Sequence, residues 1–123
     1  MEYMELHAVF VYIGIMSAAR NHAFRERQSL ALNSAVAARL STQPAPVMER
    51  AAQTLARWKL IPGTWCIDLA KWEEIVARAD VSEIHRLLTG ADETSIRLRQ
   101  SSPFSVQLEP KQRLKILRES FAA

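Results

Sequence analysis

The sequence has few of the residues that build metal sites and disulfides. It contains one cysteine, Cys66, and three histidines among 123 residues. A single cysteine allows no disulfide within the chain, which is typical of a reducing compartment and predicts a cytoplasmic protein. His7, His22, His85 and Cys66 are never two to five residues apart, the spacing that zinc sites usually need. The sequence therefore predicts neither a metal site nor a cofactor.

The patterns of common catalytic sites are absent as well. There is no Gly-x-Ser-x-Gly motif and no local motif that pairs a cysteine with a histidine. Only three glycines occur, Gly14, Gly63 and Gly90, which leaves little backbone able to wrap a phosphate group. We therefore expect a protein that acts by binding and is not an enzyme.

One pair of residues points toward an enzyme. Arg78 and His85 are separated by six residues, a spacing that resembles the Arg-to-His motif of the HEPN family of helical ribonucleases. The resemblance covers eight residues and implies that the histidine acts as a general acid or base while the arginine holds the phosphate. The alternative is a surface arginine followed by a histidine on the face of a separate helix, because Asp80 between them is typical of a helix start.

Long apolar runs are scarce too. The run at residues 8–19 is interrupted by Gly14 and Ser17 and falls short of the ~20 residues that a membrane-spanning helix requires. The seven residues before it carry acidic charge where a secretory signal needs positive charge. We therefore expect no membrane association.

The N-terminal segment allows two interpretations. Residues 7–16 are rich in β-branched and aromatic side chains, which favours a strand, but they continue into an alanine-rich stretch of strong helix formers. We favour one long helix over residues 5–40, because a lone strand would have no partner. The first half of that helix is apolar on every side, so it must be buried in the core or in a dimer. It predicts a homodimer whose contacts include Val9, Phe10, Tyr12, Ile13 and Met16.

The rest of the chain predicts further helices. Breaks at the Pro-rich segment 41–46, at Ile61–Gly63 and at Gly90 separate helices near residues 47–59, 68–79, 81–89, 93–100 and 110–121. Asp68, Asp80 and Asp92 are placed to cap three of these helices, and Pro110 suits the first turn of the last. The sequence thus predicts a single all-α domain over residues 1–123, a compact bundle of five or six helices with a long apolar N-terminal helix.

The segment between Leu55 and Trp72 also has two interpretations. A helix, a Pro-Gly break and a second helix beginning at Thr64 fit a helix-turn-helix that reads DNA. The second helix, however, carries Asp68, Glu73 and Glu74, which suit neither base edges nor nearby phosphates. We therefore favour two antiparallel core helices in which Trp58 and Trp72 face each other.

Charge is concentrated near the C-terminus. The net charge is only +3, but residues 94–118 contain six basic residues and a single acid. The last helix combines an apolar stripe of Leu114, Leu117 and Phe121 with a basic stripe beside it. The predicted partner-binding or nucleic-acid-binding residues are Arg97, Arg99, Lys111, Arg113, Lys115 and Arg118.

These patterns together favour a small regulator that binds and masks a partner protein, as an inhibitor, antitoxin-like protein or adaptor does. A helix-turn-helix regulator that binds DNA is the alternative, and a HEPN-like ribonuclease ranks third.

Overall fold

The computed structural model describes the backbone of residues 2–122 and the side chains of residues 21–121. This part of the chain is all-α and contains no strand, which confirms the predicted fold class. The helices are α1 (Glu2–Thr42), α2 (Pro44–Lys59), α3 (Ile67–Arg78), α4 (Val81–Thr89), α5 (Glu93–Arg99) and α6 (Pro110–Ala122), with a 3₁₀ turn, η1 (Ser105–Gln107), before α6.

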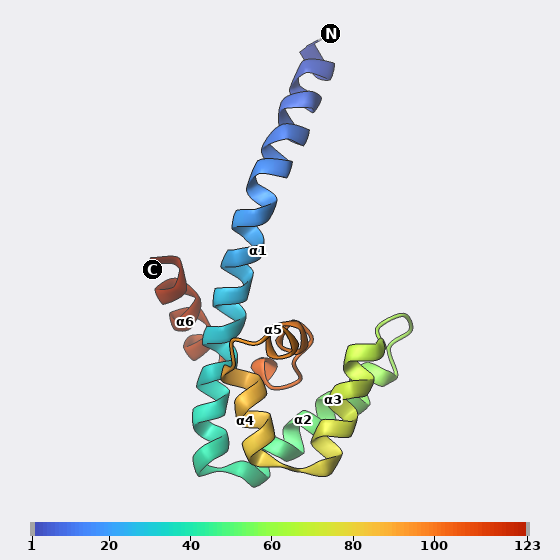
Figure 1. Cartoon of the computed structure of the whole chain (residues 1–123), viewed down its shortest axis with the longest axis vertical. Coiled ribbons are helices and arrows are strands. Elements are labelled where there is room, and N and C mark those ends of the chain that lie inside the picture. Colours follow the sequence, from blue (N-terminus) through green and yellow to red (C-terminus); the bar gives the residue numbers. More distant parts are fainter. Residues whose placement is uncertain (1, 123) are drawn as a thin grey trace.

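Helix α1 is the longest helix, and most of the other elements pack against it. Its second half contacts α2, α4, α5, η1 and α6. Its first half extends away from the bundle as a free-standing rod (Figure 1). The predicted self-association residues, Val9, Phe10, Tyr12, Ile13 and Met16, lie outside the described side chains, so their role stays a prediction.

The core is built from buried side chains of α1 to α5 and of the loop before α6. Trp72 of α3 is fully buried, and its indole Nε1 donates a hydrogen bond to the carbonyl oxygen of Leu98 at 2.7 Å. The Trp72 ring packs edge-on against Phe104, with 5.6 Å between the ring centroids. The aromatic partner of Trp72 is therefore Phe104 from the loop before α6 and not Trp58, which is half-buried at the edge of the core.

Two of the three predicted helix caps are present. Asp80 accepts a hydrogen bond from the backbone N–H of Glu83, and Asp92 accepts one from the backbone N–H of Ser95. The Ser95 hydroxyl also donates to Asp92, at 2.6 Å, and these bonds hold the pKa of Asp92 below its ordinary value of 3.8. Capping by Asp68 was wrong, because α3 begins one residue before it, at Ile67, and Asp68 pairs with Arg97 instead.

Gly90 joins α4 to α5 at a point with no room for a side chain. A Cβ there would lie 2.7 Å from the carbonyl oxygen of Arg86 and 2.8 Å from side-chain atoms of Asp92 and Ser95. We expect Gly90→Ala to lower the free energy of unfolding by about 2–3 kcal/mol, because a backbone oxygen cannot move aside without disturbing the end of α4. Urea unfolding followed by circular dichroism measures this loss.

Gly63→Ala is the matched control for that substitution. Gly63 has a φ of +79° but nothing within 4 Å of its missing Cβ, so only backbone strain of about 1 kcal/mol is expected. A smaller loss for Gly90→Ala than for Gly63→Ala would show that the α4–α5 junction is looser than the structure indicates.

Candidate interaction surface

Helix α6 covers α1 with only part of its apolar surface. It turns Ser120, Ile116 and Leu117 toward α1, and these side chains are buried or half-buried. Leu114 and Phe121 remain 50% and 78% exposed. Two of the three residues of the predicted apolar stripe therefore face outward and do not pack into the domain's own core.

Three cations stand beside these exposed apolar side chains. Lys111, Lys115 and Arg118 are exposed and follow one another at helical spacing, so they share one side of α6. None of them forms an ion pair with the acidic side chains that the structure describes. Together with Leu114 and Phe121 they form what we call the basic–apolar face of α6.

A groove of about 430 Å³ lies between this face and α1, lined by Gln28, Leu114, Leu117, Arg118 and Phe121. At one end of the groove the Phe121 ring meets the Phe24 ring of α1 edge-on, with centroids 5.2 Å apart. The Arg27 guanidinium lies 5.7 Å from the centroid of the Phe24 ring. The groove is thus mainly apolar, and Arg118 is the basic residue in its lining.

The other three predicted binding residues lie elsewhere. Arg97 pairs with Asp68 of α3 at 3.4 Å, and Arg113 donates a hydrogen bond to the carbonyl oxygen of Ser105 at 3.3 Å. Arg99 is only 5% exposed and donates to the carbonyl oxygen of Leu87 at 2.9 Å. Its burial lowers the pKa of its guanidinium from the ordinary value.

The sequence analysis assigned Arg97 and Arg99 to the same binding surface as the α6 cations, which would require α5 and α6 to pack together. In the structure α5 packs on α4 and α1, and α6 packs on α1 (Figure 1). The structure therefore places Arg99 in the interior, where it supports the fold, and keeps Lys111, Lys115 and Arg118 together on the surface. Whether these three bind a partner stays a prediction.

Helices α2 and α3 form an antiparallel hairpin (Figure 1). The helix-turn-helix interpretation needed a second helix that begins at Thr64, but α3 begins at Ile67 and seven residues separate the two helices. A helix-turn-helix uses a connection of three or four residues and crosses its helices at a large angle. The hairpin geometry fits the core-helix interpretation better than the DNA-reading one.

The hairpin turn exposes apolar side chains that the sequence analysis did not select. Leu60 and Ile67 are 84% and 83% exposed, and Ile61 is 48% exposed. Beside them Lys59 lies 5.1 Å from the centroid of the half-buried Trp65 ring and pairs with Glu73. The number of apolar residues in the turn could have drawn attention to it. That number does not show whether their side chains point outward.

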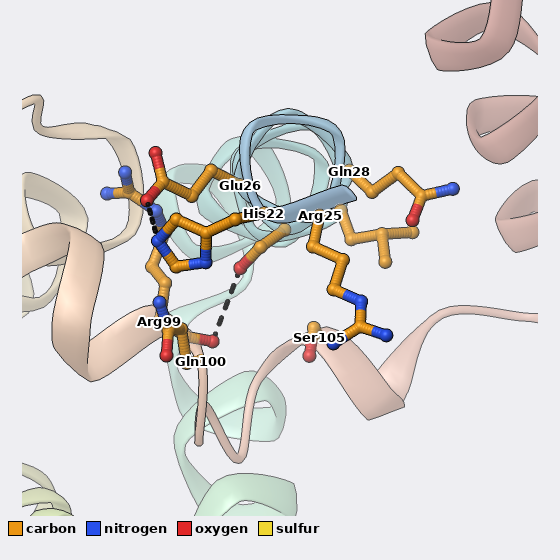
Figure 2. A pocket seen from close by; sticks show the side chains of 9 residues that line it. His22, Arg25, Glu26, Gln28, Arg99, Gln100 and Ser105 are labelled. Atoms are coloured by element: carbon orange, nitrogen blue, oxygen red, sulfur yellow. Dashed lines mark hydrogen bonds and ion pairs between the residues drawn. The ribbon is translucent and has the colours of Figure 1, made fainter. Parts of the chain in front are cut away.

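A polar groove of about 400 Å³ runs between α1 and the segment from α5 to η1. Figure 2 shows His22 and Arg25 reaching from α1 along opposite sides of this groove. The His22 Nε2 lies 2.9 Å from a Glu26 carboxylate oxygen, and the Ser29 hydroxyl donates to the Arg99 carbonyl oxygen. No serine or cysteine hydrogen-bonds to His22 among the described side chains, so a nucleophile paired with a base is not assembled here.

The Arg78 and His85 pair of the HEPN resemblance is placed on two helices. Arg78 ends α3, His85 lies within α4, and both side chains are exposed. The Arg78 guanidinium is 2.8 Å from the Glu83 carboxylate, so its charge is directed at an acid of its own chain. This ion pair occupies the arginine that the resemblance assigns to phosphate binding.

Comparison with known proteins adds no assignment: no protein-family model, no curated protein and no solved structure matches this chain. Within the described residues, no helix is long and apolar enough to cross a membrane. No group of three or more potential metal ligands is found in that part of the chain either.

Proposed function

We propose that this protein is a small non-catalytic regulator that binds an acidic partner protein through the basic–apolar face of α6. The observation that carries this proposal is the pairing of Leu114 and Phe121, both exposed, with three cations that have no acidic partner among the described side chains. Apolar anchors at the centre of a contact, surrounded by polar groups, are the usual composition of protein interfaces.

The apolar component distinguishes a protein partner from nucleic acid. A surface that binds along a phosphate backbone uses dense positive charge, and exposed leucine or phenylalanine adds little to its binding free energy. Here a groove of about 430 Å³ adjoins the cations and is lined by Leu114, Leu117 and Phe121. An amphipathic segment with apolar side chains on one face would fill this groove, and acidic side chains beside that face would pair with Arg118 and the neighbouring lysines of α6.

The proposal includes self-association through the first half of α1. That half lies beyond the bundle in Figure 1 and contains twelve consecutive residues without a charge, 8–19. A free-standing apolar helix is costly in water, and a second copy of the chain provides the simplest cover.

The experiment is a comparison of two bait proteins in native cells. The wild type should co-purify a specific acidic protein, and the variant with Lys111→Glu, Lys115→Glu and Arg118→Glu should lose it. Arg57→Glu with Lys71→Glu is the control, because both residues are exposed on the α2–α3 hairpin away from α6. Recovery of nucleic acid alone, or equal recovery of the protein by the α6 variant, would contradict the proposal.

A further inference from the structure

The polar groove between α1 and the segment from α5 to η1 carries more positive than negative charge. Among the described residues that line it, Glu26 is the single acid, and its carboxylate lies 2.9 Å from Nε2 of His22. Arg25 also lines the groove and is exposed, and it forms no ion pair with the acidic side chains that the structure describes. The Arg25 guanidinium is therefore available to an anion that enters the groove.

Two further arginines add positive charge to the walls of this groove. Arg99 lines it and is 5% exposed, and its guanidinium is held by the neutral carbonyl oxygen of Leu87 and not by a described carboxylate. Arg113 donates to the carbonyl oxygen of Ser105, another lining residue, at 3.3 Å and has no ion pair with the described acids either. A buried guanidinium without an acidic partner is unusual, because charges removed from water are normally paired. Such charges in a wall of low dielectric constant concentrate a positive potential in the groove.

The lining of the groove is polar and small enough to suit a small molecule. It includes the amides of Gln28 and Gln100 and the hydroxyl of Ser105, and Figure 2 shows Arg25 reaching toward Ser105. The one aliphatic side chain among its described lining residues, Leu32, is only 6% exposed. The groove therefore offers no apolar anchor of the kind that dominates binding at protein interfaces. Its volume of about 400 Å³ lies within the range of small-molecule sites.

We propose that this groove binds a small polar molecule with one carboxylate or phosphate group, and that Arg25 and Ser105 hold this group. A planar guanidinium donates two parallel hydrogen bonds to either kind of oxyanion, and the Ser105 hydroxyl donates a third. The amides of Gln28 and Gln100 hydrogen-bond to hydroxyl or amide groups in the rest of the molecule. This site is distinct from the basic–apolar face of α6, because none of the three cations of that face lines it.

The test is a titration of the full chain at low salt with three probes that share one carbon skeleton, followed by NMR of the backbone amide signals. Glycerol 3-phosphate and glycerate carry the two kinds of oxyanion, and glycerol is the neutral control. At least one of the two anions should cause saturable shifts of the amide signals of Arg25 and Ser105, with a dissociation constant of about 1 mM or tighter. Glycerol should cause none. The anion that binds more tightly identifies which oxyanion the site prefers.

Two arginine variants locate the binding. Arg25→Gln should weaken binding of the preferred anion at least about tenfold, because it removes charged hydrogen bonds to the oxyanion. Arg27→Gln is the matched control, because Arg27 is an exposed arginine of the same helix that lines a different cleft, together with Ile116 and Ser120. It should change the affinity less than about twofold, since it alters only the distant charge. Both residues are exposed, so neither change should alter the fold, which circular dichroism checks.

Two results would overturn this proposal. One is the absence of saturable binding of either anion up to about 10 mM, a concentration at which even a weak specific site would fill. The other is an equal loss of affinity in Arg25→Gln and Arg27→Gln, which would show that the anion responds to the overall charge of α1 and not to the groove. Neither result depends on the partner protein of the proposed function, because the titration contains this chain alone.

Discussion

Trp72→Ala should lower the free energy of unfolding by about 3–5 kcal/mol, a large share of the stability of a domain this size. Trp72 is fully buried, and its ring packs against Phe104 of the loop before α6. Truncation removes that packing, leaves a cavity, and deprives the carbonyl oxygen of Leu98 of its 2.7 Å hydrogen bond. Urea unfolding monitored by circular dichroism gives the loss directly.

The other two tryptophans are the matched controls for this prediction. The sequence analysis placed Trp58 opposite Trp72 in the core, but Trp58 is half-buried at the core edge, so Trp58→Ala should lower the free energy of unfolding clearly less. Trp65 is half-buried at the hairpin turn beneath Lys59, so Trp65→Ala should lower the free energy of unfolding least. If Trp65→Ala destabilised the protein as much as Trp72→Ala, the assignment of the core would be wrong.

The second large effect concerns the rate at which the partner protein is bound. Reversal of Lys111, Lys115 and Arg118 to glutamate should slow association with the acidic partner roughly 10- to 100-fold at low salt, because exposed charges steer the encounter. The dissociation rate should change much less, since the exposed apolar anchors Leu114 and Phe121 are retained. Stopped-flow or surface-based kinetics at two salt concentrations separate the two rates.

Phe121→Ser is the complementary variant for that experiment. Phe121 is 78% exposed and uncharged, so its loss should speed dissociation and leave association nearly unaltered. A charge-reversed variant that associates at the wild-type rate at low salt would show that the three cations do not face the partner.

Helix boundaries followed from the sequence where a local signal marked them. Asp80 and Asp92 cap α4 and α5 as predicted, and Pro110 begins α6, because capping depends on residues three positions apart. The start of α3 was misplaced because the turn after Lys59 has no capping side chain, and Cys66 occupies the position before the helix. The length of the seven-residue connection between α2 and α3 could therefore not be predicted from local residue patterns.

The interaction surface was predictable only in part, because burial depends on contacts between distant segments. Lys111, Lys115 and Arg118 share a face by helical spacing alone, and the structure keeps them together and exposed. Arg99 belongs to the same basic run, yet its side chain is buried and bound to a carbonyl oxygen twelve residues earlier in the chain. Nothing in the spacing of charged residues distinguishes a surface arginine from one that satisfies the backbone of a neighbouring helix.

The most direct test of whether this face serves a protein or a nucleic acid is a titration with a random-sequence DNA duplex at about 150 mM salt. Binding of an acidic protein and binding of nucleic acid would both use Lys111, Lys115 and Arg118. The two functions differ in how tightly the protein binds a generic duplex. Our account predicts weak binding, with a dissociation constant no tighter than about 100 µM, and little change in the variant with all three cations reversed. Submicromolar binding of this duplex that disappears in the same variant would contradict it.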